Sequence, residues 1–141
     1  MLDDIVGFLS EADFLEFGRP YLQELYATDV TVKFFHNDAA CAQSLRHYPD
    51  LGINLYNPGV QTSLAEMRRL CGHRLTILGT IPPRDVLGRG TPDEVRVAVR
   101  QLLADHPDHS RLILSCAGGM PPGVSTENIQ AFHGAVREFG A

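Results

Sequence analysis

The chain has 141 residues, enough for one domain, and its 44% hydrophobic residues are enough to form a buried core. It carries 12 Lys or Arg against 17 Asp or Glu, a formal net charge of -5, and has no basic tract. These features argue against disorder, and against nucleic acid or an anionic membrane surface as a partner.

The cysteines and the start of the chain bear on where the protein works. Cys41, Cys71 and Cys116 are odd in number, far apart and outside any CxxC pair, so we expect reduced thiols. The segment from Met1 to Asp4 is acidic and has no apolar leader run, and no apolar stretch approaches the roughly 18 residues of a membrane span. We therefore expect a soluble, cytoplasmic protein without a membrane partner.

The first quarter of the chain predicts the tail of a strand followed by a helix. Residues 1–9 hold two aspartates and a short apolar run, and Ser10 begins a pattern like a capping box. Apolar residues then recur at intervals of three and four from Phe14 to Leu25, which predicts one apolar helical stripe. Pro20 is expected to break or kink this helix, or to begin a second segment.

A strand is predicted over residues 31–36, because Val32 and Phe34 suit a buried, pleated run. His36 and Asp38 follow where this strand should end. In parallel α/β folds, functional side chains collect at the carboxyl ends of strands, so this imidazole and carboxylate are the natural centre of a site. The alternative is that His36 is a core histidine and Asp38 caps the next helix.

Three more strands are predicted further along the chain. Residues 52–56 form the second, which Asn57 closes, and residues 74–79 form the third. A proline-containing loop follows the third strand and leaves Arg84 near the strand end. Residues 111–115 form the fourth. Asn57 and Arg84 are thereby expected at the same edge of the sheet as His36 and Asp38.

Helices are predicted between and after these strands. A short one covers residues 41–47, a second begins with the capping pattern at Ser63, and a terminal one reaches Phe139. The strongest helix start in the chain is at Thr91. Proline follows it at the first helical position, and Glu94 stands at the third.

The alternation of strands and helices predicts an α/β fold, with a parallel sheet of βα units and right-handed crossovers. The connections are too long for hairpins. A closed (β/α)8 barrel needs about 250 residues, so this chain cannot close one by itself. We expect a single domain over residues 1–141 that forms part of such a barrel.

The order of several motifs resembles the C-terminal half of the uroporphyrinogen decarboxylase family along nearly the whole chain. The matching segments are Asp3-Asp4-Ile5-Val6-Gly7-Phe8-Leu9-Ser10, Phe35-His36-Asn37-Asp38, Leu78-Gly79-Thr80-Ile81-Pro82-Pro83, Thr91-Pro92-Asp93-Glu94-Val95, and Pro121-Pro122-Gly123 with Glu127-Asn128. Each motif is weak alone, but together and in order they are specific. The resemblance implies the C-terminal part of a TIM barrel, without the N-terminal half whose arginines and central aspartate hold the tetrapyrrole.

The resemblance also bears on the substrate site. Asp4 sits where the family has a substrate-facing hydroxyl residue, and Asp38 matches an aspartate of the family's strand-end motif. His36, Asn57 and Arg84 lie at predicted strand ends, and an arginine can pair with carboxylates through two parallel hydrogen bonds. We therefore expect these five residues to bind a small-molecule substrate.

The two branches of the family differ in their cofactors. The decarboxylases use none, and they place a histidine where this chain has Gly118. The sister branch of corrinoid-dependent methyltransferases binds zinc through a His-x-Cys pair and a later cysteine. An alternative zinc site would combine His36, Asp38 and Cys116, since carboxylate oxygen is an acceptable zinc ligand. The Gly118-Gly119 pair could also let backbone amides approach an anion.

Three functions follow as hypotheses. The first is the substrate-cleft half of a decarboxylase that acts on a carboxylated tetrapyrrole and is inactive alone. The second is a methyltransferase that uses zinc and a corrinoid partner, and the third is a non-catalytic binding or assembly module.

The sheet is expected to have open strand edges and an inner face that carries Val32 and Phe34. These features predict a homo-oligomer or a complex with an N-terminal half-barrel chain.

Overall fold

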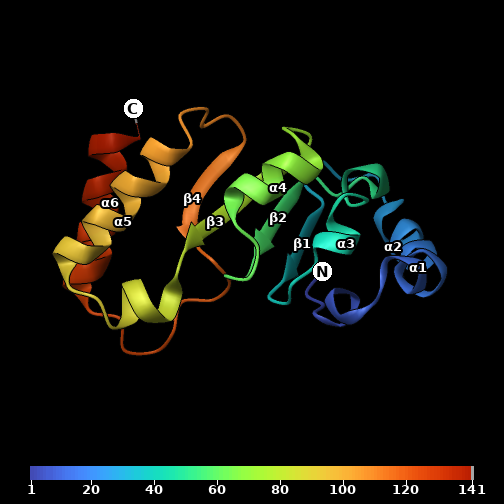
Figure 1. Cartoon of the computed structure of the whole chain (residues 1–141), viewed down its shortest axis with the longest axis horizontal. Coiled ribbons are helices and arrows are strands. Elements are labelled where there is room, and N and C mark those ends of the chain that lie inside the picture. Colours follow the sequence, from blue (N-terminus) through green and yellow to red (C-terminus); the bar gives the residue numbers. More distant parts are fainter. Residues whose placement is uncertain (141) are drawn as a thin grey trace.

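The computed structural model describes residues 1–140 as a parallel sheet of four strands that alternate with helices (Figure 1). The strands follow one another in the order β1 (Phe34–Asn37), β2 (Leu55–Pro58), β3 (Thr76–Ile81) and β4 (Leu112–Cys116). Each strand therefore pairs with its neighbour in the sequence. The predicted α/β class and parallel sheet are confirmed.

The helical elements lie between and around these strands. They are η1 (Ile5–Phe8), α1 (Glu11–Asp13), η2 (Phe14–Gly18), α2 (Arg19–Tyr26), α3 (Ala42–Leu45), η3 (Pro49–Leu51), α4 (Leu64–Cys71), η4 (Pro83–Gly88), α5 (Pro92–Asp105) and α6 (Thr126–Phe139). Within residues 1–140, none of these helices has both the length and the apolar character needed to cross a bilayer.

The strands begin later than the sequence pattern predicts. The first starts at Phe34 rather than at position 31, and Val32 lies before it with 59% of its surface exposed. The expectation that Val32 belongs to the first strand was therefore wrong. The same shift places Asn57 inside β2 rather than after it, whereas His36 lies inside β1 and Asp38 directly beyond that strand.

The first three residues form the predicted tail of a further strand. Leu2 makes an isolated parallel bridge to His36. His36 N donates to Met1 O at 2.9 Å, and Asp3 N donates to His36 O at 3.1 Å. This short segment therefore lies beside β1 and brings Asp4 to the carboxyl end of that strand.

The first helical region follows its prediction in part. The π-helical turn η2 leads directly into α2, and Pro20 lies in the first turn of this second segment. The apolar stripe is only partly buried. Phe14 and Leu22 face the core, whereas Phe17, on η2, and Tyr21, on α2, are exposed.

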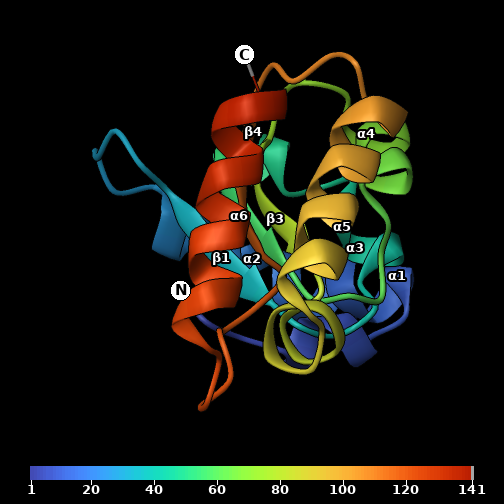
Figure 2. The same ribbon diagram turned by 90° about the vertical axis from the view of Figure 1, so that its left-hand side faces the viewer.

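Two clusters of buried side chains hold the helices to the sheet. The first lies under α2, α3 and α4, where Phe35 packs edge-on against Tyr48 with 5.0 Å between ring centroids. The second lies between β3, η4, α5 and α6. In this second part α5 and α6 run side by side (Figure 2), and Arg96 pairs with Glu138 across them. Residues Cys41 and Cys71 belong to the first cluster, and burial raises the pKa of the Cys71 thiol to about 11.

The start of α5 is the predicted capping box. Glu94 N donates to Thr91 Oγ1 at 3.3 Å, and Thr91 N donates to Glu94 Oε2 at 2.7 Å. These bonds to Thr91 lower the pKa of Glu94. The carboxylate therefore stabilises the fold above its ordinary pKa, and this contribution is lost as the pH falls through the lowered value.

We expect Thr91→Ala to lower the free energy of unfolding by about 1 kcal/mol, because Glu94 N loses its acceptor, Thr91 Oγ1, and the Glu94 carboxylate loses the hydroxyl that donates to it. Urea denaturation at neutral pH measures this change. Thr126→Ala is the control, since Thr126 is the first helical residue of α6 and follows the capping residue Ser125. Equal losses in the two variants would contradict a capping role for Thr91.

Candidate functional site

A cleft of about 510 Å³ lies at the carboxyl edge of the sheet. The segments that follow all four strands contribute to it. Its lining residues are Asp38, Gly59, Val60, Pro82, Pro83, Arg84, Asp85, Ala117, Gly119, Pro121 and Pro122. The cleft therefore combines one carboxylate and one guanidinium predicted for the site, Asp38 and Arg84, with walls rich in proline.

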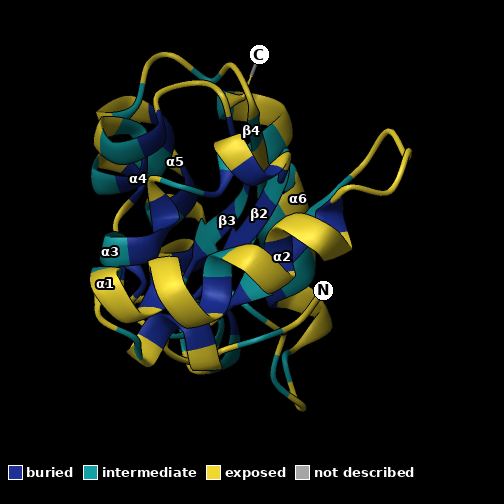
Figure 3. Cartoon of the chain, turned by 90° about the vertical axis from the view of Figure 1, so that its right-hand side faces the viewer, coloured by how far each residue is buried: buried dark blue, intermediate teal, exposed yellow. Residues whose placement is uncertain are grey.

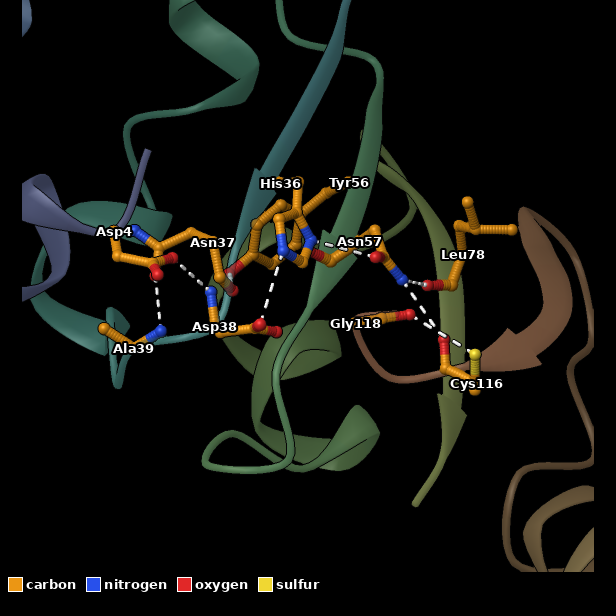
Figure 4. Close-up of polar contacts among 10 residues, drawn as sticks. All are labelled: Asp4, His36, Asn37, Asp38, Ala39, Tyr56, Asn57, Leu78, Cys116 and Gly118. Atoms are coloured by element: carbon orange, nitrogen blue, oxygen red, sulfur yellow. Dashed lines mark hydrogen bonds and ion pairs between the residues drawn. The ribbon is translucent and has the colours of Figure 1, made fainter. Parts of the chain in front are cut away.

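Asn57 forms the centre of a hydrogen-bond network beneath the cleft (Figure 4). Its side chain is 7% exposed, and its Nδ2 donates to the main-chain oxygens of Leu78 and Cys116. These two acceptors belong to β3 and β4. They orient the amide so that its oxygen faces His36, and they tie the end of β2 to both later strands.

The network fixes the orientation of the His36 ring. Nδ1 of His36 lies 2.9 Å from Asn57 Oδ1 and 3.1 Å from Asn57 O. Both oxygens can only accept a hydrogen bond, so Nδ1 carries a proton and donates it. The other ring nitrogen, Nε2, lies 3.4 Å from Asp38 Oδ2 and so faces the carboxylate.

Asp38 is held from three sides while its carboxylate stays accessible. Its backbone N–H donates to Asp4 Oδ1 at 2.7 Å. A Cβ built on Gly59 would lie 2.3 Å from Asp38 O, and one built on Gly118 would lie 2.5 Å from Asp38 Oδ1. Gly118 also has a φ of 67°, which favours glycine. The side chain of Asp38 is nevertheless 53% exposed, so it can meet a ligand.

Arg84 enters the cleft from η4, which belongs to the second core cluster. The segment is anchored by Asn128, whose Nδ2 donates to Leu87 O at 2.9 Å and to Gly90 O at 2.7 Å. The guanidinium of Arg84 is exposed, whereas the neighbouring Asp85 pairs with Arg89 at 3.6 Å. An anchored backbone thus presents an exposed cationic side chain to the cleft.

The structure brings the predicted site residues together in two ways. Asp38 and Arg84 line the cleft itself. Asp4, His36 and Asn57 lie behind Asp38, and their side chains form hydrogen bonds with other groups of the protein. The sequence pattern did not reveal Gly59 as a packing partner of Asp38. Its only signal was the turn-like triplet that Gly59 completes with the preceding asparagine and proline.

The alternative zinc site is not assembled. It would need Cys116 beside His36 and Asp38, yet no three His, Cys, Asp or Glu side chains of residues 1–140 are grouped so that they could hold a metal ion. The Cys116 thiol instead donates to Gly118 O at 3.3 Å. The arrangement of His36, Asp38 and Cys116 therefore does not fit a zinc ion.

Comparison with known proteins gives one consistent family. The sequence model of the family Uroporphyrinogen decarboxylase (URO-D) matches residues 1–139. The uroporphyrinogen decarboxylase of Hahella chejuensis is 27% identical over 96% of this chain and 39% of its own length. That of Chlorobium phaeobacteroides is 26% identical over 98% of this chain and 41% of its own.

A solved structure supports the same fold. A methyltransferase from Methanosarcina mazei superposes with a TM-score of 0.85 at 20% identity, over 100% of this chain and 42% of that protein. The chain therefore spans about two fifths of the length of the relatives it matches.

Proposed function

The chain belongs to the uroporphyrinogen decarboxylase family, and on that basis we propose that its cleft is the substrate-binding part of a decarboxylase that acts on a carboxylated tetrapyrrole. The observation that carries the proposal is the presence of Asp38 and Arg84 in one cleft at the carboxyl edge of the sheet. The curated relatives reported above support it, because they carry the name uroporphyrinogen decarboxylase.

The chemistry of the cleft suits such a ligand. The guanidinium of Arg84 can form two parallel hydrogen bonds with a carboxylate substituent. The carboxylate of Asp38 accepts hydrogen bonds, and the pyrrole N–H groups of a tetrapyrrole donate them. The cleft volume of about 510 Å³ lies within the range of small-molecule sites. The proline walls add an apolar surface for the ring carbons.

The isolated chain is proposed to bind but not to turn over its substrate. It spans only 39% of the Hahella chejuensis relative. The arginines and the central aspartate that the family resemblance assigns to tetrapyrrole binding and to the cationic intermediate lie in the part without a counterpart here. His36 and Asn57 hold the position of Asp38, but they cannot replace those groups. Alone, the chain acts as a binding module.

We expect Arg84→Gln to weaken binding of uroporphyrin, a stable fluorescent carboxylated tetrapyrrole, about tenfold, which corresponds to about 1.4 kcal/mol. Quenching of the porphyrin fluorescence measures the dissociation constant. Arg100→Gln is the matched control, because Arg100 is an exposed arginine of α5 that does not line the cleft. The wild-type chain should bind saturably, and equal weakening in both variants would speak against the proposed role of Arg84.

A further inference from the structure

A second surface lies away from the cleft, along α2 and the turn before it (Figure 3). Phe17, Tyr21 and Leu25 are spaced four residues apart, so they share one side of the helical segment. Their exposed fractions are 60%, 66% and 59%. Three large apolar side chains in one row thus face outward, whereas Phe14 and Leu22 of the same segment are buried.

The apolar surface continues beyond the end of α2 into a hollow. A pocket of about 350 Å³ includes Leu25, Val30 and Val32 in its lining, together with Lys33 and the chain start at Met1. Val30 and Val32 are 51% and 59% exposed. We call this surface the α2 face; its members are Phe17, Tyr21, Leu25, Val30 and Val32. A contiguous group of exposed apolar side chains often marks an interaction site, whereas apolar residues that are exposed singly do not.

The charge around the α2 face limits what can cover it. Residues 1–33 contain seven Asp or Glu, one Arg and one Lys, a net charge of -5, which equals the net charge of the whole chain. The remainder of the chain therefore has no net charge. A symmetric pair of α2 faces would bring two acidic segments together, and an anionic bilayer would be repelled. Electrostatic complementarity favours a basic partner.

We propose that the α2 face binds an amphipathic helix of another polypeptide, with an apolar stripe flanked by Lys or Arg. The row from Phe17 through Tyr21 to Leu25 offers ridges for helix-on-helix packing, and Tyr21 at its centre is the expected anchor. The pocket beside Leu25 receives a large apolar side chain at the end of the partner stripe. This proposal is independent of what the cleft binds.

The relatives suggest where such a helix would come from. The chain matches about two fifths of their length, so the rest of a relative has no counterpart here. A separate polypeptide that supplies further βα units beside the Met1–Asp3 segment would place its own helix next to α2. The expected N-terminal half-barrel partner is thus a concrete source of the helix, with the added requirement of basic flanks.

The test uses the full chain and two designed helical peptides of about 18 residues, or five turns. Both carry the same leucine stripe, one with lysine flanks and the other with glutamate flanks. Fluorescence anisotropy is expected to show that the lysine peptide binds at least about tenfold more tightly. The double variant Phe17→Gln/Tyr21→Gln should lose this binding by a similar factor. Val97→Gln on α5 is the matched control, because Val97 is a singly exposed valine, 50% accessible.

Three results would overturn the proposal. They are the absence of saturable binding by the lysine peptide, equal binding of the two peptides, and equal loss in the Val97→Gln control. Light scattering on the chain alone supplies a further outcome. A dimer that the double variant converts to monomer would assign the α2 face to a second copy and would likewise refute a basic helix as its partner. Circular dichroism of each variant confirms that the exposed substitutions leave the fold intact.

Discussion

Replacing Asn57 with aspartate is expected to lower the free energy of unfolding by about 3 kcal/mol or more. The variant loses the Nδ2 group that donates to Leu78 O and Cys116 O. It also turns a carboxylate toward these two carbonyl oxygens at a position that is 7% exposed. Because β2, β3 and β4 meet at this amide, all three strand ends should separate. Chemical denaturation at neutral pH measures the loss.

Asn54→Asp is the matched control for this change. Asn54 Nδ2 donates only to Thr31 O, in an exposed loop, and its Oδ1 can still accept from Lys33 N after the substitution. The expected loss is below about 1 kcal/mol. If Asn57→Asp cost no more than this control, the idea that the buried amide joins the strand ends would be wrong.

Gly59→Ala is expected to cost about 3 kcal/mol and to weaken uroporphyrin binding by at least about tenfold. The added Cβ would lie 2.3 Å from Asp38 O and 2.7 Å from its Cα. These are backbone atoms, so no side-chain rotation can relieve the overlap. The segments after β1 and β2 must move apart, which displaces the Asp38 carboxylate. Denaturation and fluorescence titration of the same variant measure the two effects.

Gly119→Ala tests whether the effect is specific to Gly59. Gly119 lines the same cleft, but a Cβ at this position would meet no atom within 4 Å. We expect a change in the free energy of unfolding within about 0.5 kcal/mol. Similar losses in both variants would show that the cleft loops tolerate no side chain at all, rather than that Gly59 packs against Asp38.

The sequence predicted local features better than those that depend on the neighbouring strand. The helix start at Thr91 was predicted correctly, because a capping box is a contact between residues three apart. The first strand was placed too early, because Val32 has strand propensity but does not pair within the sheet. The helical spacing of Phe17 and Tyr21 predicted correctly that they share a face. It could not show that this face has no covering element among residues 1–140.

In the candidate site, too, contacts between residues far apart in the sequence were harder to predict than local features. Asp38 and Arg84 were expected near each other, because the carboxyl ends of parallel strands meet at one edge of a sheet. The role of Asn57 was not predictable, since its two acceptors lie 21 and 59 residues away along the chain. The close packing of Gly118 on Asp38 depends on the conformation of the loop after β4. No local pattern encodes such contacts.

The cleft lies across the junction of the two core clusters. Asp38 follows β1, whose Phe35 belongs to the first cluster, and Arg84 lies in η4, whose Leu87 belongs to the second. The clusters share the partly buried Leu102 and Leu112, and β3 supplies Ile77 to the first and Ile81 to the second, so the sheet joins them. A ligand held by both Asp38 and Arg84 would add a further contact between the two clusters. Because such a ligand binds only the folded chain, its binding should raise the midpoint of thermal unfolding.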